Sequence, residues 1–210
     1  MKILVTAGAT KEHIDDVRYI TNDSSGRMGV EIALEAKKRG HTPVLVCGEN
    51  VAAPDGVECV VAASAKDMLD AVVEAIADRE IRVLVSAAAV SDFTVEGKTD
   101  AKIKSGGRLN LTLSPTKKIL GEARKMFPRL RLVGFKAEAS VSEKELIDSA
   151  RRIIDAYGLE FAVANDLTDG VMGGEDTQAV LVGVGWEEHF KGSKRMLSES
   201  ILDLIENPPT

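Results

Sequence analysis

The chain has 210 residues, which is the usual size of one domain with a buried core. Its 44% hydrophobic and 29% charged residues exclude a disordered, collagen-like or coiled-coil chain. A net charge of −6 and only 4% aromatic residues argue against nucleic acid or an anionic membrane as a partner. We therefore expect one domain over residues 1–210, in which any bound anion is held by a local site.

The cysteines and the lack of a long apolar run bear on the compartment. Cys47 and Cys59 lie in apolar segments without a Cys-x-x-Cys pair, so we expect buried, reduced side chains rather than a metal or redox site. No apolar run reaches the ~18 residues that span a bilayer, and the N-terminus opens directly as a strand. These features predict a cytoplasmic protein.

Short apolar runs alternate with amphipathic segments along the chain. The runs predicted to be strands are residues 1–6, 42–47, 57–61, 81–87, 109–113, 130–135, 160–164 and 178–184. The segments predicted to be helices are residues 25–39, 65–79, 116–126, 143–157 and 196–205. Repeated strand-helix-strand units predict an α/β fold, a Rossmann-like open, mostly parallel sheet with helices on both faces. The alternating pattern of 109–113 adds a small antiparallel element.

The loop after the first predicted strand is long and does not match a dinucleotide-binding fingerprint. A G-x-G-x-x-G turn would open its helix within a few residues, whereas here the helix follows Gly8 only near Ser25. Parallel sheets bind ligands beyond the carboxyl ends of their strands, where such loops gather. Ser24, Ser25 and Gly26 can present hydroxyl and backbone N–H groups to a phosphate at a helix start. The alternative is that Asp23 or Ser24 only caps the helix.

Later segments also carry candidate ligand-binding residues. The small residues 86–89 permit close approach to the backbone, and Asp92 is either a ribose ligand or a turn residue. Lys102 belongs to a lysine pair that either neutralises a phosphate or decorates the surface. Phe135 covers a base or packs in the core, and the glycine-rich residues 169–176 are a candidate mobile flap.

These blocks follow one another in a recognisable order. The first blocks are Thr6-Ala7-Gly8-Ala9-Thr10, Arg18-Tyr19-Ile20-Thr21-Asn22 and Ser24-Ser25-Gly26-Arg27-Met28-Gly29. The later blocks are Ala88-Ala89-Val90-Ser91-Asp92-Phe93, Lys102-Ile103-Lys104, Gly134-Phe135-Lys136-Ala137-Glu138 and Ala164-Asn165-Asp166. Together they closely resemble the phosphopantothenate-cysteine ligase (phosphopantothenoylcysteine synthetase) family. The resemblance covers essentially the whole chain, and its first blocks are the most specific.

The resemblance implies a nucleotide-driven ligase of coenzyme A biosynthesis. In bacterial-type members, the carboxylate of 4′-phosphopantothenate displaces pyrophosphate from CTP and forms an acyl-cytidylate. The amine of L-cysteine then attacks the acyl carbon, and CMP leaves. Magnesium is expected to accompany the triphosphate. No flavin is expected in this chain and, because its three histidines are scattered, no metal held directly by protein ligands.

The resemblance also implies residue roles by position. Lys102 would steady the α-phosphate in the first step, and Asn22 would donate to the acyl carbonyl oxygen in the second. Arg18 and Ala89 would bind the pantothenate portion. The implied phosphate-binding residues are Gly8, Ser24, Ser25 and Gly26. The implied nucleotide-binding residues are Ser86, Ala87, Ala88, Asp92, Lys102, Pro115 and Phe135.

Three departures from the family pattern bear on these roles. Ser105 stands where many relatives have a further lysine, so one phosphate contact differs. Ile153 and Tyr157 align with two nucleotide-contacting lysines of bacterial relatives, which leaves CTP and ATP both open. Bacterial relatives are often fused behind a flavin-dependent phosphopantothenoylcysteine decarboxylase, which this chain lacks. That decarboxylase is therefore an expected separate or fused partner.

The family further implies a homodimer, with contacts near residues 109–113 and 178–184 and a partner loop that completes each site. From the residues alone, two other functions stay open: an NAD(P)-dependent oxidoreductase and a non-catalytic nucleotide-binding module. The missing glycine fingerprint and the absence of a Tyr-x-x-x-Lys pair weigh against the first. The second gives Asn22 and Lys102 no chemical role.

Overall fold

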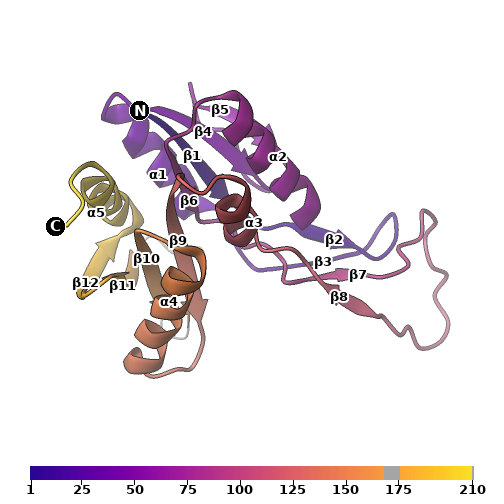
Figure 1. Cartoon of the computed structure of the whole chain (residues 1–210). Coiled ribbons are helices and arrows are strands. Elements are labelled where there is room, and N and C mark those ends of the chain that lie inside the picture. Colours follow the sequence, from indigo (N-terminus) through magenta and orange to yellow (C-terminus); the bar gives the residue numbers. More distant parts are fainter. Residues whose placement is uncertain (168–175, 210) are drawn as a thin grey trace.

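The apolar runs of the sequence form a central sheet because aliphatic and β-branched side chains can be buried on both of its faces. The computed structural model describes residues 1–167 and 176–209. Its eight-stranded sheet has the order β12-β11-β10-β9-β6-β1-β4-β5 (Figure 1). These strands are β1 (Lys2–Ala7), β4 (Thr42–Cys47), β5 (Glu58–Val61), β6 (Val83–Ser86), β9 (Arg131–Glu138), β10 (Phe161–Asp166), β11 (Asp176–Gly183) and β12 (Trp186–Ser193).

The pairing of the strands confirms the predicted Rossmann-like sheet. β5, β4, β1, β6, β9 and β10 are parallel to one another, and β11 and β12 are each antiparallel to the preceding strand. In chain order the parallel strands take the arrangement 3-2-1-4-5-6, which reverses direction between β1 and β6. A ligand site is therefore expected beyond the carboxyl ends of these two strands.

Helices cover both faces of the sheet, as predicted. α1 (Arg27–Lys38) and α5 (Lys194–Glu206) lie on one face. α2 (Ala65–Asp78), α3 (Ile119–Met126) and α4 (Glu143–Tyr157) lie on the other face (Figure 1). Alternate residues of each strand serve the two cores, because successive side chains point to opposite faces.

The start of α1 differs from the starts of the other long helices. Ser64, Ser142 and Ser193 cap α2, α4 and α5 through their side chains. α1 instead begins at Gly26, which has φ 73° and no side-chain cap, so the alternative that Asp23 or Ser24 caps this helix is wrong. Ser24 Oγ accepts from the Gly26 N–H at 3.4 Å, but no side chain of the described residues caps the first turn of α1.

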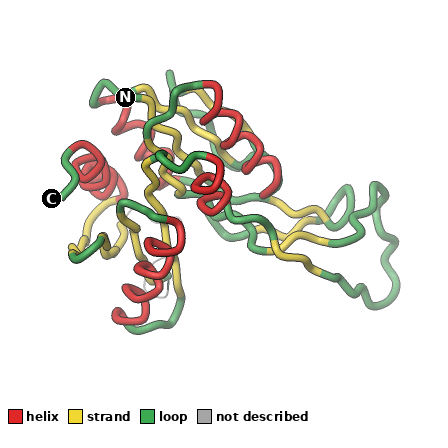
Figure 2. Tube along the Cα trace, in the orientation of Figure 1, coloured by secondary structure: helices red, strands yellow, loops and turns green. Residues whose placement is uncertain are grey.

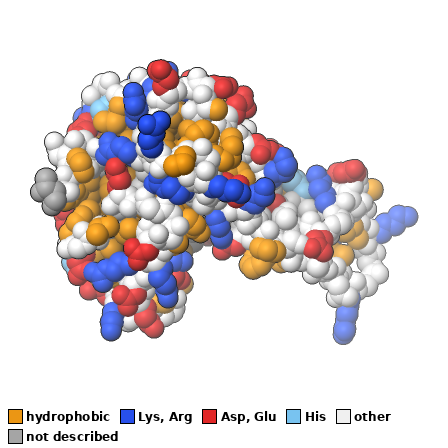
Figure 3. Space-filling view, viewed as in Figure 1, with side chains coloured by type: hydrophobic (Ala, Val, Ile, Leu, Met, Phe, Trp, Pro, Cys, Tyr) orange, Lys and Arg blue, Asp and Glu red, His pale blue; other side chains and the backbone are white. Residues whose placement is uncertain are grey.

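Two short hairpins, residues 11–21 and 93–115, project from the body and are called the arm (Figure 1). The arm pairs β2 (Lys11–His13) with β3 (Tyr19–Thr21), and β7 (Phe93–Val95) with β8 (Leu113–Pro115). Its tip consists of loops (Figure 2), and hydrophobic side chains lie on its surface (Figure 3).

The arm corrects two expectations. The connection after β1 is not plain loop, because it folds into the β2–β3 hairpin. The strand expected at 109–113 begins only at Leu113, and Leu109 and Leu111 are 48% and 39% exposed in the preceding loop. An alternating pattern selects a register only where one face is buried, and these leucines have no layer over them.

The antiparallel end of the large sheet, which contains β11 and β12, also differs from expectation. The predicted strand 178–184 is observed as β11, but it pairs with both β10 and β12 and is not an exposed edge. β12, which sequence analysis missed, forms that edge and carries mostly charged, exposed side chains, as edge strands often do. The tight Val184-Gly185 turn, with Gly185 at φ 80°, is the signal that could have revealed it.

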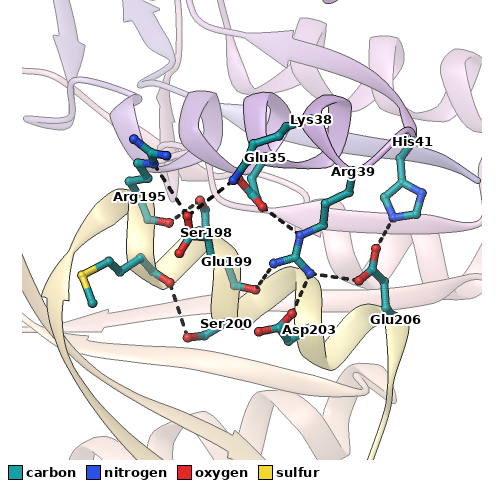
Figure 4. Close-up of polar contacts among 11 residues, drawn as sticks. Glu35, Lys38, Arg39, His41, Arg195, Ser198, Glu199, Ser200, Asp203 and Glu206 are labelled. Atoms are coloured by element: carbon teal, nitrogen blue, oxygen red, sulfur yellow. Dashed lines mark hydrogen bonds and ion pairs between the residues drawn. The ribbon is translucent and has the colours of Figure 1, made fainter.

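An ion-pair network fastens the C-terminal ends of α1 and α5 together (Figure 4). Arg39 donates to carboxylate oxygens of Glu35 at 2.8 Å, Asp203 at 2.6 Å and Glu206 at 2.9 Å. His41 also contacts Glu206 at 2.7 Å. At the opposite ends of the same helices, Arg27 and Lys194 line a common cavity, so α1 and α5 run side by side in the same direction.

The cysteines agree with the expectation of unreactive side chains. Cys47 is buried and Cys59 is half-buried, and both are free thiols. Burial raises the pKa of the Cys47 thiol to about 11, so it stays protonated at neutral pH. Among the described helices, none is long and apolar enough to cross a membrane.

Candidate active site

The loops that follow β1 and β6 are hydrogen-bonded to each other at the switch point. The backbone N–H of Ala89 donates to the carbonyl oxygen of Gly8 at 2.8 Å, and Thr10 N–H donates to Ala89 at 3.4 Å. Inside this junction, the Thr6 hydroxyl accepts from the N–H of Ala88 at 3.1 Å. The loops after β1 and β6 thus join at the carboxyl ends of the parallel strands and together form the floor of the candidate site.

Two adjoining cavities open above this floor. The smaller cavity, of about 210 Å³, is lined by the start of α1, including Ser24, Ser25 and Gly26. The larger cavity, of about 590 Å³, is lined by Asn22 and Asp92, among others. The cavities share five lining residues: Ala88, Ala89, Phe135, Ala137 and Leu167. Most of the predicted site residues therefore surround one continuous cleft.

Close backbone packing holds the start of α1 against the end of β1. A Cβ atom on Gly26, which has φ +73°, would lie 2.7 Å from the backbone nitrogen of Gly8. Asn50, which sequence analysis missed, ties the same region together, because its Nδ2 donates to the Ser24 carbonyl oxygen at 2.7 Å. Asn50 follows the carboxyl end of β4, on the same side of the sheet as the loops after β1 and β6. That position is the signal that could have identified it.

Asn22 lines the larger cavity and is hydrogen-bonded to Ala89, a residue that both cavities share. Its Nδ2 donates to the carbonyl oxygen of Ala89 at 3.1 Å. The preceding Thr21 hydroxyl donates to the Thr10 carbonyl oxygen at 2.8 Å, which anchors the segment. A primary amide has two N–H donors and one acceptor oxygen, so Asn22 retains a donor for a ligand at the junction.

The larger cavity combines charged and apolar walls. Asp92 forms a short contact with Lys118, a residue that sequence analysis did not identify. The neighbouring Thr116 donates through Oγ1 to the Ser91 carbonyl oxygen at 2.6 Å, which is why α3 starts later than expected. Ile153 and Tyr157 also line this cavity. The two positions that carry nucleotide-contacting lysines in bacterial relatives therefore face the cavity here, but neither has a positive charge.

Four predicted residues lie outside both cavities: Gly8, Arg18, Lys102 and Pro115. Gly8 is buried behind Gly26. Pro115 is exposed in β8, and Lys102 is exposed in the loop between β7 and β8. Arg18 lies in the turn of the β2–β3 hairpin, where its Nη2 donates to the Ile103 carbonyl oxygen at 2.6 Å. The described part of the predicted flap is Asp176, and residues 169–175 of that segment lie outside the described residues.

Asp15 clamps the segment that carries Lys102. Its buried carboxylate accepts from the backbone N–H groups of Val17 and Arg18, each at 2.8 Å, and of Ile103 at 3.0 Å. Burial alone would raise the pKa of Asp15, but these N–H groups and the Arg18 guanidinium hold it below its ordinary value. Arg18 and Asp15 therefore position the residue next to Lys102 in this chain.

Replacing Asp15 by asparagine is expected to loosen this clamp, because an amide has one acceptor oxygen and no charge. The Ile103 amide should then exchange with deuterium at least about tenfold faster, as in local opening. Asp16→Asn, which alters the exposed neighbour, should leave exchange unchanged. Unchanged exchange at Ile103 in Asp15→Asn would show that the clamp does not hold the loop.

The same clamp should weaken in acid. The folded pKa of Asp15 is lowered, so its stabilisation is complete above the ordinary aspartate pKa of about 4 and is lost as the pH falls through the folded value. Intrinsic-rate-corrected exchange at Ile103 should therefore rise only below about pH 4. A rise that begins near neutral pH would contradict this assignment.

The fold and the cleft define an open α/β protein of the Rossmann type, with its candidate site at the topological switch point. The family model described as "DNA/pantothenate metabolism flavoprotein C-terminal domain" matches residues 1–208. The chain belongs to this family, which confirms at family level the resemblance drawn from its motifs. In the described residues, no group of three or more His, Cys, Asp or Glu side chains is placed to hold a metal ion.

Individual relatives agree with the family match. The chain is 44% identical over 207 residues to the coenzyme A biosynthesis bifunctional protein CoaBC of Thermococcus kodakarensis, covering 98% of this chain and 51% of that protein. It is 34% identical to the protein of that name from Methanocaldococcus jannaschii, covering 98% and 50%. The chain thus spans about half the length of these curated relatives.

A solved structure described as the DNA/pantothenate metabolism flavoprotein from Streptococcus pneumoniae is similar over the whole fold. It superposes with a TM-score of 0.88 at 29% identity and 98% coverage of both chains. A second similar structure is the C-terminal domain of a coenzyme A biosynthesis bifunctional protein CoaBC, with a TM-score of 0.80 at 30% identity, covering 98% of this chain and 93% of that one.

Proposed function

We propose that this chain is a phosphopantothenate-cysteine ligase of coenzyme A biosynthesis. The observation that carries the proposal is the continuous cleft at the switch point. The uncapped start of α1 lines one cavity, Asp92 and Asn22 line the other, and Asn22 is bonded to the shared residue Ala89. The family match and the names of its relatives, which are coenzyme A biosynthesis bifunctional proteins, support it.

The proposed reaction has two steps. A carboxylate oxygen of 4′-phosphopantothenate attacks the α-phosphorus of the nucleoside triphosphate, the bond to the β-phosphate breaks, and pyrophosphate leaves. The L-cysteine nitrogen then attacks the acyl carbon, loses a proton, and displaces the nucleoside monophosphate. Activation is needed because a free carboxylate has no adequate leaving group at neutral pH.

In this proposal the two cavities of the cleft bind different parts of the substrates. The nucleoside occupies the larger one, where Asp92 accepts hydrogen bonds from the ribose and Phe135 lines the wall. Pro115, which precedes the lining residue Thr116, would enclose the nucleotide from outside the cavity. The backbone of Ser86, Ala87 and Ala88 supplies further nucleotide contacts. Gly8, Ser24, Ser25 and Gly26 bind phosphate at the start of α1, where backbone amides and the helix dipole favour an anion.

Asn22 is proposed to act at the junction of the cavities. Its hydrogen bond to Ala89 leaves an amide donor that can stabilise the acyl oxygen as cysteine attacks. Ala89 itself would contact the pantothenate portion. The reacting carbonyl group would thus be placed where the two loops of the switch point meet.

Lys102 and Arg18 require a second subunit in this proposal. Both lie on the arm, away from the residues that line the two cavities of their own chain. Exposed apolar side chains on the arm favour contact with another copy: Phe93, Leu109, Leu111 and Leu113. We infer a homodimer in which the arm of one subunit brings Lys102 and Arg18 to the site of its partner.

Magnesium is proposed to arrive with the triphosphate. The described walls of the cleft contain two carboxylates, Asp23 and Asp92, which are too few to enclose the ion. The walls therefore fit an ion held by phosphate oxygens and water rather than directly by protein ligands. When bound, the ion would neutralise charge on the triphosphate.

The test is pyrophosphate release across CTP, ATP, GTP and UTP. We expect pyrophosphate only when phosphopantothenate and a triphosphate are both present, and full release of the monophosphate only after cysteine is added. CTP is the expected nucleotide. ATP is the alternative because Ile153 and Tyr157 stand where bacterial relatives have two nucleotide-contacting lysines. Tight NADPH binding without triphosphate consumption would favour a reductase, and triphosphate binding without consumption a non-catalytic module.

The proposed product also indicates a partner enzyme. Because the chain spans about half of its curated bifunctional relatives, we propose that a flavin-dependent phosphopantothenoylcysteine decarboxylase consumes the product, either fused to this chain or separate. The flavin belongs to that enzyme, and no flavin role is assigned to the cleft described above.

A further inference from the structure

The smaller cavity contains a positive charge that the proposed roles leave unused. Lys194 is the first residue of α5 and lines this cavity beside Ser24, Ser25 and Gly26. Arg27 lines it as well. Among the described residues that surround the cavity there is no aspartate or glutamate.

Within the described ranges, no acidic side chain pairs with Lys194. Its side chain is half-buried, and within the described part of the chain its ammonium takes part in no ion pair or hydrogen bond. Burial and the nearby Arg27 guanidinium both lower the pKa of Lys194. An anion that enters beside Lys194 would offset the cost of partly burying its ammonium group.

The position of Lys194 is maintained by the packing of α5 on α1. The Arg39 network joins the C-terminal ends of these helices (Figure 4). At their N-terminal ends, Arg27 and Lys194 line the same cavity. Ser193 caps α5 by accepting from the Met196 N–H at 3.2 Å, which fixes the backbone just before Lys194. The ammonium group is therefore delivered by a rigid element rather than by a loop.

We propose that Lys194 binds the β- and γ-phosphates of the nucleoside triphosphate, and the pyrophosphate that they become. This inference rests on the proposed function. The acyl-nucleotide forms at the junction beside Asn22, so the phosphates beyond the α-phosphate extend into the smaller cavity. A volume of about 210 Å³ with two cations and two serines suits a compact polyanion.

The first test measures binding of CTP, ATP, CMP, AMP and pyrophosphate to the full chain by calorimetry. For Lys194→Gln we expect at least about tenfold weaker binding of the preferred triphosphate and of pyrophosphate, with the monophosphate changed less than about twofold. Lys194→Arg should retain most of the affinity. Arg195→Gln removes the same charge from an exposed neighbour paired with Glu199 and should stay within about twofold of the native protein.

A kinetic readout separates the two phosphate-bearing substrates. Lys194→Gln should raise KM for the triphosphate about tenfold and leave KM for phosphopantothenate unchanged. The assignment is overturned if KM for phosphopantothenate rises instead, if the monophosphate weakens as much as the triphosphate, or if Arg195→Gln has the same effect. A native chain that binds no triphosphate would defeat the proposed function as well, whereas native-like Lys194→Gln in an active enzyme defeats only the role of Lys194.

Discussion

Replacing Lys102 by glutamine is expected to reduce pyrophosphate formation from phosphopantothenate and triphosphate by roughly 10²–10³-fold. The reason is that the first step develops negative charge on the α-phosphate, and a neutral amide cannot offset that charge. Triphosphate binding should weaken far less, because the nucleoside and the start of α1 provide most of the contacts. A discontinuous pyrophosphate assay without cysteine isolates this step.

Lys104→Gln is the matched control for this variant. Lys104 lies two residues away in the same exposed loop and is expected to change the rate by less than about threefold. If Lys104→Gln and Lys102→Gln slow the first step equally, the loop supplies only general positive charge. If Lys102→Gln forms pyrophosphate at the native rate, Lys102 has no part in nucleotidyl transfer.

Replacing Asn22 by aspartate is expected to have a comparably large effect on the second step. Pyrophosphate should appear in a burst of about one equivalent per site, after which cysteine-dependent release of the monophosphate slows by roughly 10²–10³-fold. A carboxylate cannot donate to the acyl oxygen, and it repels the negative charge that develops there. It also loses the donor to Ala89 that positions the side chain.

Quench-flow measurement of pyrophosphate and monophosphate in parallel checks that Lys102 acts in the first step and Asn22 in the second. The melting temperature of each variant verifies that the fold is retained, because Asn22 also has a structural hydrogen bond. Equal loss of pyrophosphate formation in Asn22→Asp and Lys102→Gln would refute the assignment of the two residues to different steps.

The same two variants test whether the arm acts on its partner. In a mixed dimer of Lys102→Gln and Asn22→Asp chains, one site receives a native Asn22 and a native Lys102 from different subunits. Random mixing should then restore about a quarter of the native activity. If the two residues serve the same chain, both sites of the mixed dimer stay defective and no activity returns.

The body of the fold could be predicted because its signals are local. The segment 143–157 has helical spacing, and α4 spans Glu143–Tyr157 as expected, with a capping box at Ser142. The arm could not be predicted in the same way. β7 and β8 have three residues each and are stabilised by a partner some twenty residues away, which a local pattern does not reveal.

The candidate site likewise contains residues that the sequence identifies and residues that it does not. The loops after β1 and β6 could be selected because strand ends gather at a switch point, and Ala89 lies in the second of them. Asn22 directly follows β3, and its role came from the family resemblance. Asn50 follows β4 and could have been found by the same strand-end argument. Lys194 reaches the site only through the packing of α5, and no local motif marks it. In the proposed homodimer the site of Lys102 lies on a second subunit, which no single-chain pattern encodes.

The most direct test of the account follows the α-phosphate in a single turnover without cysteine. With α-³²P-labelled triphosphate and excess phosphopantothenate, the label should move into a covalent adduct with the acid while unlabelled pyrophosphate is released. Addition of cysteine should then convert that adduct to labelled monophosphate. Label that appears instead in a nucleoside diphosphate would show activation through an acyl phosphate, and would contradict attack at the α-phosphorus.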